Sequence, residues 1–312
     1  MRDSHGRHIT YLRLSVTDRC SLRCRYCMPA SGTAKRDRAG ICSVEELVGI
    51  AAAAVDCGIR KIRLTGGEPL VRRDILDICR GIAALPGVEE LCLTTNGLAL
   101  PGSAEALKAA GVARLNISLD TLRPDRYAYM TRTGRLEDAL RGLEAAGEAG
   151  FTGTKLNVVL MEGFNDDEIP AFVDLARRYP IEVRFIELMP IGEGRNARPL
   201  PAQAVLDACP DLRPAWDRGV ARRYRPPGGQ GLVGLIEPMS RRFCAQCDRI
   251  RVTADGKLKP CLHSGQEIPL RGLHGEALRR AIEDGIAAKP EHHHMTETGR
   301  SAAGRDMNQI GG

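Results

Sequence analysis

Short apolar, β-branched runs alternate with amphipathic stretches from residue 9 to about residue 210, and this alternation limits the possible folds more than any other feature. The apolar runs predict strands and the amphipathic stretches predict helices. The expected strands are 9–16, 59–65, 88–95, 113–120, 153–160 and 181–189, and the expected helices lie near 43–57, 74–85, 103–110, 137–149 and 166–178. About six βα units with short links imply a parallel sheet, either doubly wound or curled into a full or partial barrel.

Polar, glycine-bearing segments stand at the ends of these expected strands. They are TGGEP (65–69), TTNG (94–97), SLD (118–120), Lys155 with Asn157, and ELMP (187–190). Each segment alone is also typical of an ordinary βα turn. Because ligands of parallel α/β folds bind at the carboxyl ends of the strands, we expect these segments to line a single mouth.

Cys20, Cys24 and Cys27 form a CxxxCxxC cluster directly after the first expected strand. Three thiolates on one short loop can hold a soft metal centre and leave one coordination position free. A Cys₄ site would need a fourth ligand that this segment lacks, and three cysteines cannot pair evenly in disulfides. A chance grouping of buried cysteines is the alternative.

A second set consists of Cys244, Cys247 and Cys261. Taken alone, it resembles a zinc ribbon that lacks one ligand, and His263 could be the fourth. Two three-thiolate sites in one chain favour a pair of open iron–sulfur sites instead. The remaining cysteines stand in apolar surroundings and are expected in the core: Cys42, Cys57, Cys79, Cys92 and Cys209.

The formal net charge of +6 comes with a preference for arginine over lysine. Guanidinium groups suit bidentate contacts with phosphate or carboxylate, which predicts an anionic small molecule as a partner. Residues 1–14 are charged throughout and lack the apolar segment of a secretory signal, and no run is long enough for a transmembrane helix. Eleven cysteines without an export signal therefore predict a cytoplasmic protein.

The composition changes near residue 216. Residues 222–236 predict short antiparallel strands with turns, and a final helix is expected near 275–286. The tail that follows is polar, and its composition is typical of a flexible segment in which His292–His294 are solvated. The expected division is a βα part at 1–215 and a C-terminal region at 216–312.

Four segments together carry a resemblance to a known family. They are SVTDRCSLRCRYCMP, IRLTGGEPLVRRD, FCAQCDRIRVTADGKLKPCL and the terminal Gly311-Gly312. The combination, which covers almost the whole chain, resembles the GTP 3′,8-cyclase family, radical S-adenosylmethionine enzymes that catalyse the first step of molybdenum cofactor biosynthesis. The resemblance implies an α/β fold, an incomplete (βα)₆ barrel followed by a C-terminal region with a second iron–sulfur cluster.

The same resemblance implies two [4Fe-4S] clusters and S-adenosylmethionine as cofactors. The implied ligands are Cys20, Cys24 and Cys27 for the first cluster, which also binds S-adenosylmethionine, and Cys244, Cys247 and Cys261 for the second. Family positions that contact S-adenosylmethionine are matched by Tyr26, mainly through its backbone, and by Gly67, Ser118 and Met189. A glycine at the second of these positions suits a close approach because it has no Cβ.

GTP is the implied substrate. Family positions that contact it are matched by Arg13, Arg63, Thr94, Lys155, Arg249 and Arg251, and Arg184 is expected to join them. Several cations suit a triphosphate because each makes charge-assisted hydrogen bonds. The open iron of the second cluster would bind the guanine base, and the tail would bring Gly311 and Gly312 into the active site, where the family requires them for activity.

The implied reaction starts with reductive cleavage of S-adenosylmethionine to a 5′-deoxyadenosyl radical, which abstracts the C3′ hydrogen of GTP. The C3′ radical then bonds to C8 of guanine, giving (8S)-3′,8-cyclo-7,8-dihydroguanosine 5′-triphosphate. Holding sugar and base at a fixed separation is the catalytic task. The residues expected to take part directly are Arg249, Arg251, Gly311 and Gly312.

The family further implies a homodimer, a flavodoxin or ferredoxin as reductant, and a possible transfer of the product to the cyclic pyranopterin monophosphate synthase. Binding to nucleic acid or to a membrane is not expected, because aromatic residues are few and no concentrated basic stripe occurs. Two other function classes remain open. One is a peptide-modifying radical enzyme, which would usually carry a longer cysteine-rich extension, and the other is a zinc-binding module without enzymatic activity.

Overall fold

The computed structural model describes residues 1–33, 37–216 and 219–311. Within them a single sheet runs in the order β12-β11-β10-β1-β2-β3-β4-β5-β6-β9-β8-β7. Its strands are β1 Tyr11–Ser15, β2 Lys61–Thr65, β3 Glu90–Thr95, β4 Arg114–Ser118, β5 Lys155–Leu160, β6 Glu182–Glu187, β7 Arg213–Pro214, β8 Arg222–Arg225, β9 Leu232–Ile236, β10 Arg249–Val252, β11 Lys257–Lys259 and β12 Ile268–Pro269. The helices are α1 Val44–Asp56, α2 Ile75–Ala83, α3 Ala104–Ala109, α4 Pro124–Thr131, α5 Leu136–Glu148, α6 Ile169–Arg178, α7 Gln203–Ala208, α8 Gly275–Ala287, α9 Met295–Thr298 and α10 Met307–Ile310.

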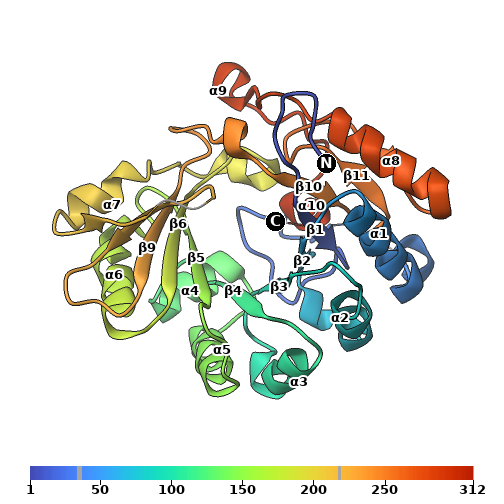
Figure 1. Cartoon of the computed structure of the whole chain (residues 1–312). Helices are drawn as coiled ribbons and strands as arrows, with labels where there is room; N and C mark the ends of the chain where they lie inside the picture. The colour runs from blue at the N-terminus through green and yellow to red at the C-terminus, as the bar shows by residue number, and fades with distance from the viewer. Residues whose placement is uncertain (34–36, 217–218, 312) are drawn as a thin grey trace.

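The six predicted strands are β1 to β6, which lie side by side in chain order and pair in parallel. Helices α1, α2, α3, α5 and α6 cover the outer face of this curved sheet (Figure 1). The sheet does not close on itself, so the prediction of an incomplete barrel is confirmed. Helices α4, α7, α9 and α10 were not predicted. Helix α4 starts with Pro124 in its first turn and ends at Thr131, before Arg132, which has a left-handed φ of 62°. Its sequence, PDRYAYMT, is too polar to show a clear apolar face.

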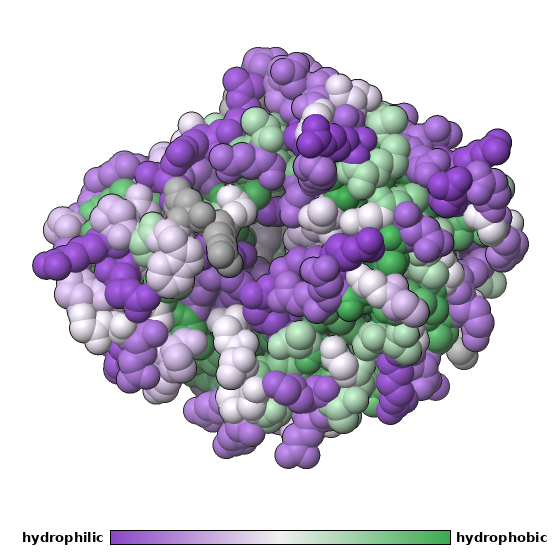
Figure 2. All heavy atoms as spheres, viewed as in Figure 1, coloured by the Kyte–Doolittle hydropathy of each residue, from purple (hydrophilic) through white to green (hydrophobic). Residues whose placement is uncertain are grey.

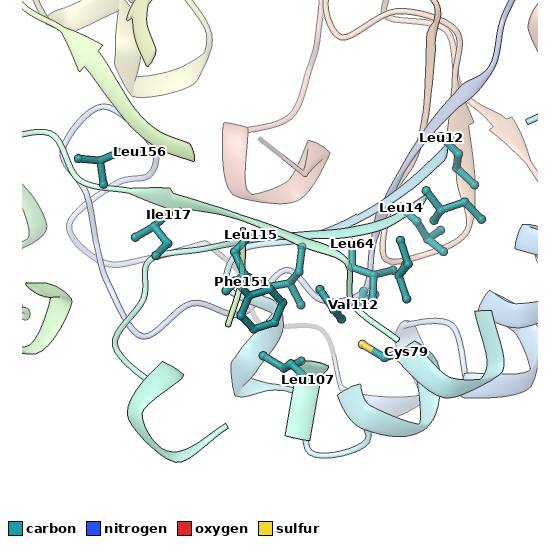
Figure 3. Close-up of a cluster of buried hydrophobic side chains, with 14 of the residues drawn as sticks. Leu12, Leu14, Leu64, Cys79, Leu107, Val112, Leu115, Ile117, Phe151 and Leu156 are labelled. Carbon is teal, nitrogen blue, oxygen red and sulfur yellow. The ribbon is translucent and has the colours of Figure 1, made fainter. Parts of the chain in front are cut away.

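The strands of the curved sheet alternate between an apolar outer face and a polar inner face. Figure 3 shows the outer side, where Leu12, Leu64 and Leu115 of three strands pack over Leu107 and Phe151. All five side chains are at most 6% exposed. Because the helices cover only the outer face, the inner face is left to form a site.

The C-terminal region extends both ends of the parallel sheet. β9 pairs in parallel with β6, and β10 pairs in parallel with β1. The segment 237–248 therefore crosses from one end of the curved sheet to the other and faces its inner side. The predicted antiparallel strands and final helix are confirmed as β8, β9 and α8. The sheet runs unbroken past residue 215, and the division into two domains stays a prediction.

The tail differs from what its composition indicates. Asn308 and Ile310 of α10 are 3% and 1% exposed, and the Asn308 side chain donates hydrogen bonds to the Asp18 carbonyl and the Thr33 hydroxyl. The expectation of a flexible tail is wrong for these residues because tertiary contacts, which composition does not report, hold them. The second residue of the diglycine, Gly312, lies outside the described residues. No described helix is both long enough and apolar enough to span a membrane.

Candidate active site

A cavity of about 520 Å³ lies against the inner face of the curved sheet. Figure 2 shows a hollow in this face of the molecule, bordered mainly by hydrophilic residues. Six of the seven side chains expected to contact GTP line this cavity: Arg13, Arg63, Lys155, Arg184, Arg249 and Arg251. The seventh, Thr94, lies next to Arg63, whose Nη1 donates to the threonine hydroxyl at 3.5 Å.

The register of the strands explains why the arginines meet. Arg13 of β1 stands opposite Arg63 of β2 and opposite Arg251 of β10. Side chains at equivalent positions of adjacent strands point to the same face, so three guanidinium groups form a row across the sheet. Arg249 and Arg251, two residues apart on β10, share that face as predicted.

Two cations of this row, Arg13 and Arg251, are electrostatically unfavourable without an anion. At Arg63, in contrast, burial is outweighed, mainly by Tyr11, and the pKa is raised. Burial and the charges of Arg63 and Arg249 lower the pKa of Arg13 to about 10, although Tyr11 counteracts them. Burial and the neighbouring charges of Arg13 and Arg249 lower the pKa of Arg251 far below its ordinary value. A polyanionic ligand would relieve this repulsion and bind strongly.

Lys155 begins β5 and does not stand at its carboxyl end as expected, but the inward direction of its side chain still brings it into the cavity. It forms a buried ion pair with Glu182, which also pairs with Arg184 and Arg223. Burial, followed by the charge of Arg184, lowers the pKa of Lys155 to about 7 even though Glu182 opposes the shift. Lys155 is therefore a cation whose charge depends on what enters the cavity.

Sequence reasoning missed several residues of the inner face. The Tyr11 hydroxyl accepts a 2.6 Å hydrogen bond from Arg63 Nε, and Arg223 lines the cavity through its pair with Glu182. The side-chain oxygens of Asn116 and Asn157 are buried there without a hydrogen-bond partner among the described residues. The signal that could have found Tyr11 is its spacing of two residues from Arg13 on one strand.

The first cysteine loop is held by the carboxyl ends of β3 and β4. Asn96 donates to the Ser21 hydroxyl at 3.1 Å, and the Tyr26 hydroxyl donates to the Asp120 carboxylate at 2.9 Å. Glu68 joins these strand ends because its carboxylate accepts from the Thr95 hydroxyl at 2.8 Å and from the Asn96 amide at 2.6 Å. The strand-end segments TGGEP, TTNG and SLD thus meet the cysteine loop.

Cys20, Cys24 and Cys27 fit a soft metal cluster. Burial raises the pKa of Cys20 to about 11 and that of Cys27 to about 12, and the pKa of Cys24 is raised by burial and by its two neighbouring thiols. Buried thiolates so close together need a bound cation to compensate their charge. Gly67 packs against the start of this loop, where a Cβ would lie 2.4 Å from the Arg19 carbonyl oxygen.

The other residues expected at S-adenosylmethionine occupy neighbouring strand ends. Ser118 is the last residue of β4, and Met189 follows β6 and lines the large cavity. The Tyr26 backbone carbonyl lies 3.5 Å from the position that a Cβ of Gly194 would take. These positions lie along the carboxyl edge of the sheet, as a common site requires.

Cys244, Cys247 and Cys261 all line the large cavity. Burial opposes ionisation of Cys247, but the charges of Lys289 and Arg249 outweigh it and lower the pKa of this thiol. His263, the alternative zinc ligand, also lines the cavity, with its ring centroid 5.0 Å from that of His293. The other five cysteines are buried, which confirms their assignment to the core.

Among the described residues, one group could hold a single metal ion. It consists of His292, His294 and Glu297, whose ligand atoms all lie within 4.8 Å of one another. These side chains are 39%, 62% and 51% exposed, whereas His293 between them is buried and bonds to the Pro238 carbonyl at 3.0 Å. The expectation of a solvated run is therefore wrong for His293. Neither cysteine triad forms such a single-ion group among the described residues.

The tail reaches this site through Gly311. Its carbonyl oxygen accepts a 2.6 Å hydrogen bond from Arg251 Nη1. Helix α10, which precedes Gly311, accordingly lies in the middle of the molecule beside β1 (Figure 1). Cations, cysteines and the tail thus converge on the inner face of one curved sheet.

Two protein families match this chain. Residues 14–176 match the Radical SAM superfamily, and residues 181–295 match the family described as Molybdenum Cofactor Synthesis C. Curated proteins called GTP 3′,8-cyclase align along the whole length. Those of Alkaliphilus oremlandii and Moorella thermoacetica are 45% and 47% identical, with both partners covered in full. That of Peptoclostridium acidaminophilum is 49% identical over 99% of this chain and 98% of its own.

Solved structures show the same fold at much lower identity. SuiB of Streptococcus suis bound to S-adenosylmethionine superimposes with a TM-score of 0.66 at 14% identity, covering 93% of this chain and 68% of SuiB. SuiB without that ligand gives a TM-score of 0.62 with similar coverage. At this identity the likeness concerns the fold alone.

Proposed function

This chain belongs to the GTP 3′,8-cyclase family of radical S-adenosylmethionine enzymes, and from that membership we propose that it converts GTP to 3′,8-cyclo-7,8-dihydro-GTP, the first step of molybdenum cofactor biosynthesis. The observation that carries this proposal is that buried cations and the second cysteine triad line one cavity. A triphosphate at one end of the cavity and a base at the other would hold the nucleotide from both ends.

Family membership implies a [4Fe-4S] cluster and S-adenosylmethionine, and the first cysteine loop is the proposed site for both. Cys20, Cys24 and Cys27 would hold three irons and leave the fourth to the amino and carboxylate groups of S-adenosylmethionine. When bound, this cluster supplies the electron that cleaves S-adenosylmethionine and generates the radical that removes the C3′ hydrogen of GTP. Gly67 is the proposed contact of the methionine end, and it must be glycine because a Cβ there would meet the Arg19 carbonyl.

The inner face of the sheet would bind the triphosphate. Arg13, Arg63 and Arg251 can each donate charge-assisted hydrogen bonds to phosphate oxygens, and Arg249, Lys155, Arg184 and Thr94 would complete the set. The mutual repulsion of these cations supports an anionic substrate. Holding the ribose between the phosphate end and the base end would keep C3′ close to C8, as intramolecular attack requires.

A second cluster is proposed at Cys244, Cys247 and Cys261, with its open iron bound to the guanine base. Its support is chemical: three cysteines line the cavity and no fourth cysteine accompanies them among the described residues. Arg251 and Gly311, joined by a hydrogen bond, would stand between the two clusters and close the reaction chamber to water.

Other partners are proposed on family grounds. A flavodoxin or ferredoxin would supply electrons, the protein would form a homodimer, and the product would pass to the cyclic pyranopterin monophosphate synthase. The proposed location is the cytoplasm, where low-potential reductants are available and thiolates stay reduced. The proposed parts of the chain are a radical barrel at 1–215 and a second-cluster region at 216–312.

Anaerobic reconstitution followed by turnover tests the function. We expect about eight irons per chain, as two [4Fe-4S] clusters require. With GTP deuterated at C3′, deuterium should appear in 5′-deoxyadenosine, and GTP lacking the 3′ label is the control. Uptake of zinc without iron, or 5′-deoxyadenosine free of deuterium beside cyclised product, would contradict the proposal.

A further inference from the structure

The cysteines of the second triad come from separate stretches of chain. Cys244 begins a short 3₁₀ turn, Cys244–Gln246, Cys247 precedes β10, and Cys261 follows β11. The Cys247 amide donates to the Cys244 carbonyl at 3.1 Å, which fixes these two relative to each other. The position of Cys261 relative to them must come from other contacts.

Arg7 provides one set of such contacts from the N-terminal hairpin. Its side chain is 7% exposed, and its Nε pairs with the buried Asp3 carboxylate at 2.6 Å. Its Nη1 donates to the carbonyl oxygens of Cys244 at 2.9 Å and Glu291 at 2.8 Å, and its Nη2 donates to that of Pro290 at 2.7 Å. The planar guanidinium thus uses its donors to join residue 244 to the segment after α8.

Lys289, in that same segment, provides the second set. It is 3% exposed, and its Nζ donates to the Arg249 carbonyl at 2.8 Å and to the Pro260 carbonyl at 3.0 Å. Arg249 lies two residues after Cys247, and Pro260 directly precedes Cys261. Arg7 Nη2 also donates to the Lys289 carbonyl at 3.4 Å, so the two cations belong to one network.

We infer that Asp3, Arg7 and Lys289 form a buried network that positions the three cysteines of the second cluster. The inference rests on the proposed function for the presence of that cluster. The three side chains act as positioning residues, because their hydrogen bonds end on the backbone beside the cysteines and not on the cysteine sulfurs. The N-terminal hairpin, although about 240 residues away in sequence, thereby becomes part of the second-cluster site.

The charges in this network suit a cluster of thiolates. Asp3 neutralises Arg7, whereas the hydrogen bonds of the Lys289 ammonium end on carbonyl oxygens. Lys289 also lines the cavity with Cys247, so its positive charge would lie near a cluster held there. Buried cations near an iron–sulfur cluster stabilise its more negative, reduced form and raise its reduction potential. Positioning and electrostatic support therefore come from the same residues.

Two backgrounds isolate the clusters for the test. Replacing Cys20, Cys24 and Cys27 by serine leaves the second cluster alone, and replacing Cys244, Cys247 and Cys261 leaves the first. Arg7→Met and Lys289→Met are introduced into each background, and iron per chain and its release to a chelator are measured after anaerobic reconstitution. In the second-cluster background we expect release about tenfold to a hundredfold faster, as for other residues that orient metal ligands. In the first-cluster background we expect no change.

Further measurements separate positioning from folding. Arg126→Met removes a cation on α4 that pairs with Glu168 at 2.9 Å and serves as the matched control, with iron release unchanged in both backgrounds. Lys289→Arg keeps the charge and should restore cluster retention. Lys289→Met should also shift the reduction potential of any second cluster that the variant retains to a more negative value.

Equal rates of iron release to the chelator with and without Arg7 or Lys289, or equal losses of iron in both backgrounds, would overturn the inference. Failure of the unsubstituted second-cluster background to bind iron would instead contradict the proposed second cluster.

Discussion

Arg251 Nη1 donates a 2.6 Å hydrogen bond to the carbonyl oxygen of Gly311, which joins strand β10 to the C-terminal tail. Gly311 has a left-handed φ of 81°, and a Cβ there would lie 2.5 Å from Thr65 Oγ1 and 3.1 Å from Ser15 Cβ. Both the conformation and the space therefore demand glycine. The tail is seated at the carboxyl ends of β1 and β2, inside the proposed reaction chamber.

Replacing Gly311 by alanine should weaken the packing of the tail against Ser15 and Thr65. The left-handed conformation costs a residue with a Cβ about 1–2 kcal/mol, and the close contact with Thr65 adds to it. Since 1.4 kcal/mol is a factor of about ten, we expect cyclised product per 5′-deoxyadenosine to fall roughly tenfold. Gly304→Ala is the control, because a Cβ at Gly304 meets nothing within 4 Å. An unchanged product ratio in Gly311→Ala would show that this packing of the tail is not needed for cyclisation.

Lys155 predicts a pH dependence of GTP binding. Its pKa is lowered to about 7 by burial and by Arg184, so in the free enzyme the ammonium form prevails below that pH and the amine above it. If the ammonium binds phosphate, the KM for GTP should rise as the pH increases through 7, by up to about tenfold per unit. Lys155→Arg should flatten this profile, because a guanidinium stays charged. The same steep rise in Lys155→Arg would assign the pH dependence to another group.

The same lowered pKa also predicts the sign of a stability change. Between pH 7 and the ordinary lysine pKa of 10.5, the unfolded chain binds the Lys155 proton that the folded chain releases. The contribution of Lys155 to the free energy of unfolding should therefore increase with pH across this window. The difference between wild type and Lys155→Met in urea denaturation at pH 7 and pH 9 measures it. A difference that does not change between these pH values would show that the lysine titrates normally.

The sequence predicted the parallel strands well because their apolar outer residues and intervening helices form a local, repeating pattern. It could not predict that β9 and β10 extend opposite ends of the sheet. Their pairing depends on partners such as Tyr11 and Arg249, which are far apart in the chain. Helix α4 was missed for a different reason, since its polar sequence gives no periodic signal.

The site residues also differ in whether the sequence alone could reveal them. The cysteine sets were visible because cluster ligands are close in sequence, and the family resemblance supplied the arginines of the inner face. Residues such as Tyr11 and Arg223 were missed because only the register of neighbouring strands brings them to the cavity. The burial of Asn308 was missed because a polar composition reports average solvation and not particular contacts.

Glu68 should increase the free energy of unfolding through its hydrogen bonds beside the first cysteine loop. Burial raises the pKa of this carboxyl to about 7, although hydrogen bonds from Asn96, Leu70 and Thr95 oppose the shift. Both carboxylate oxygens accept backbone hydrogen bonds, so Glu68→Gln would place an amide NH₂ against one of these donors. We expect a loss of about 1–3 kcal/mol in the free energy of unfolding, measured with urea on the cluster-free chain.

The control for Glu68→Gln is Glu105→Gln on α3, an exposed carboxylate whose substitution should stay within about 0.5 kcal/mol of wild type. A Glu68 variant as stable as this control would mean that the glutamate is protonated in the folded chain at the pH of measurement. Repeating the denaturation at pH 6 and pH 8, on either side of the Glu68 pKa of about 7, distinguishes the two protonation states.

Cys261→Ser should separate the two halves of the proposed reaction. Cys261 lines the cavity of the second triad, and no described hydrogen bond joins residues 244–261 to the loop of the first triad. We therefore expect iron to fall from about eight to about four per chain, with S-adenosylmethionine cleavage continuing while cyclised product is lost. Cys209→Ser, a buried cysteine at the end of α7, is the control and should keep both clusters. Loss of all iron in Cys261→Ser would make this cysteine a structural residue, because a ligand of the second cluster alone leaves the first cluster in place.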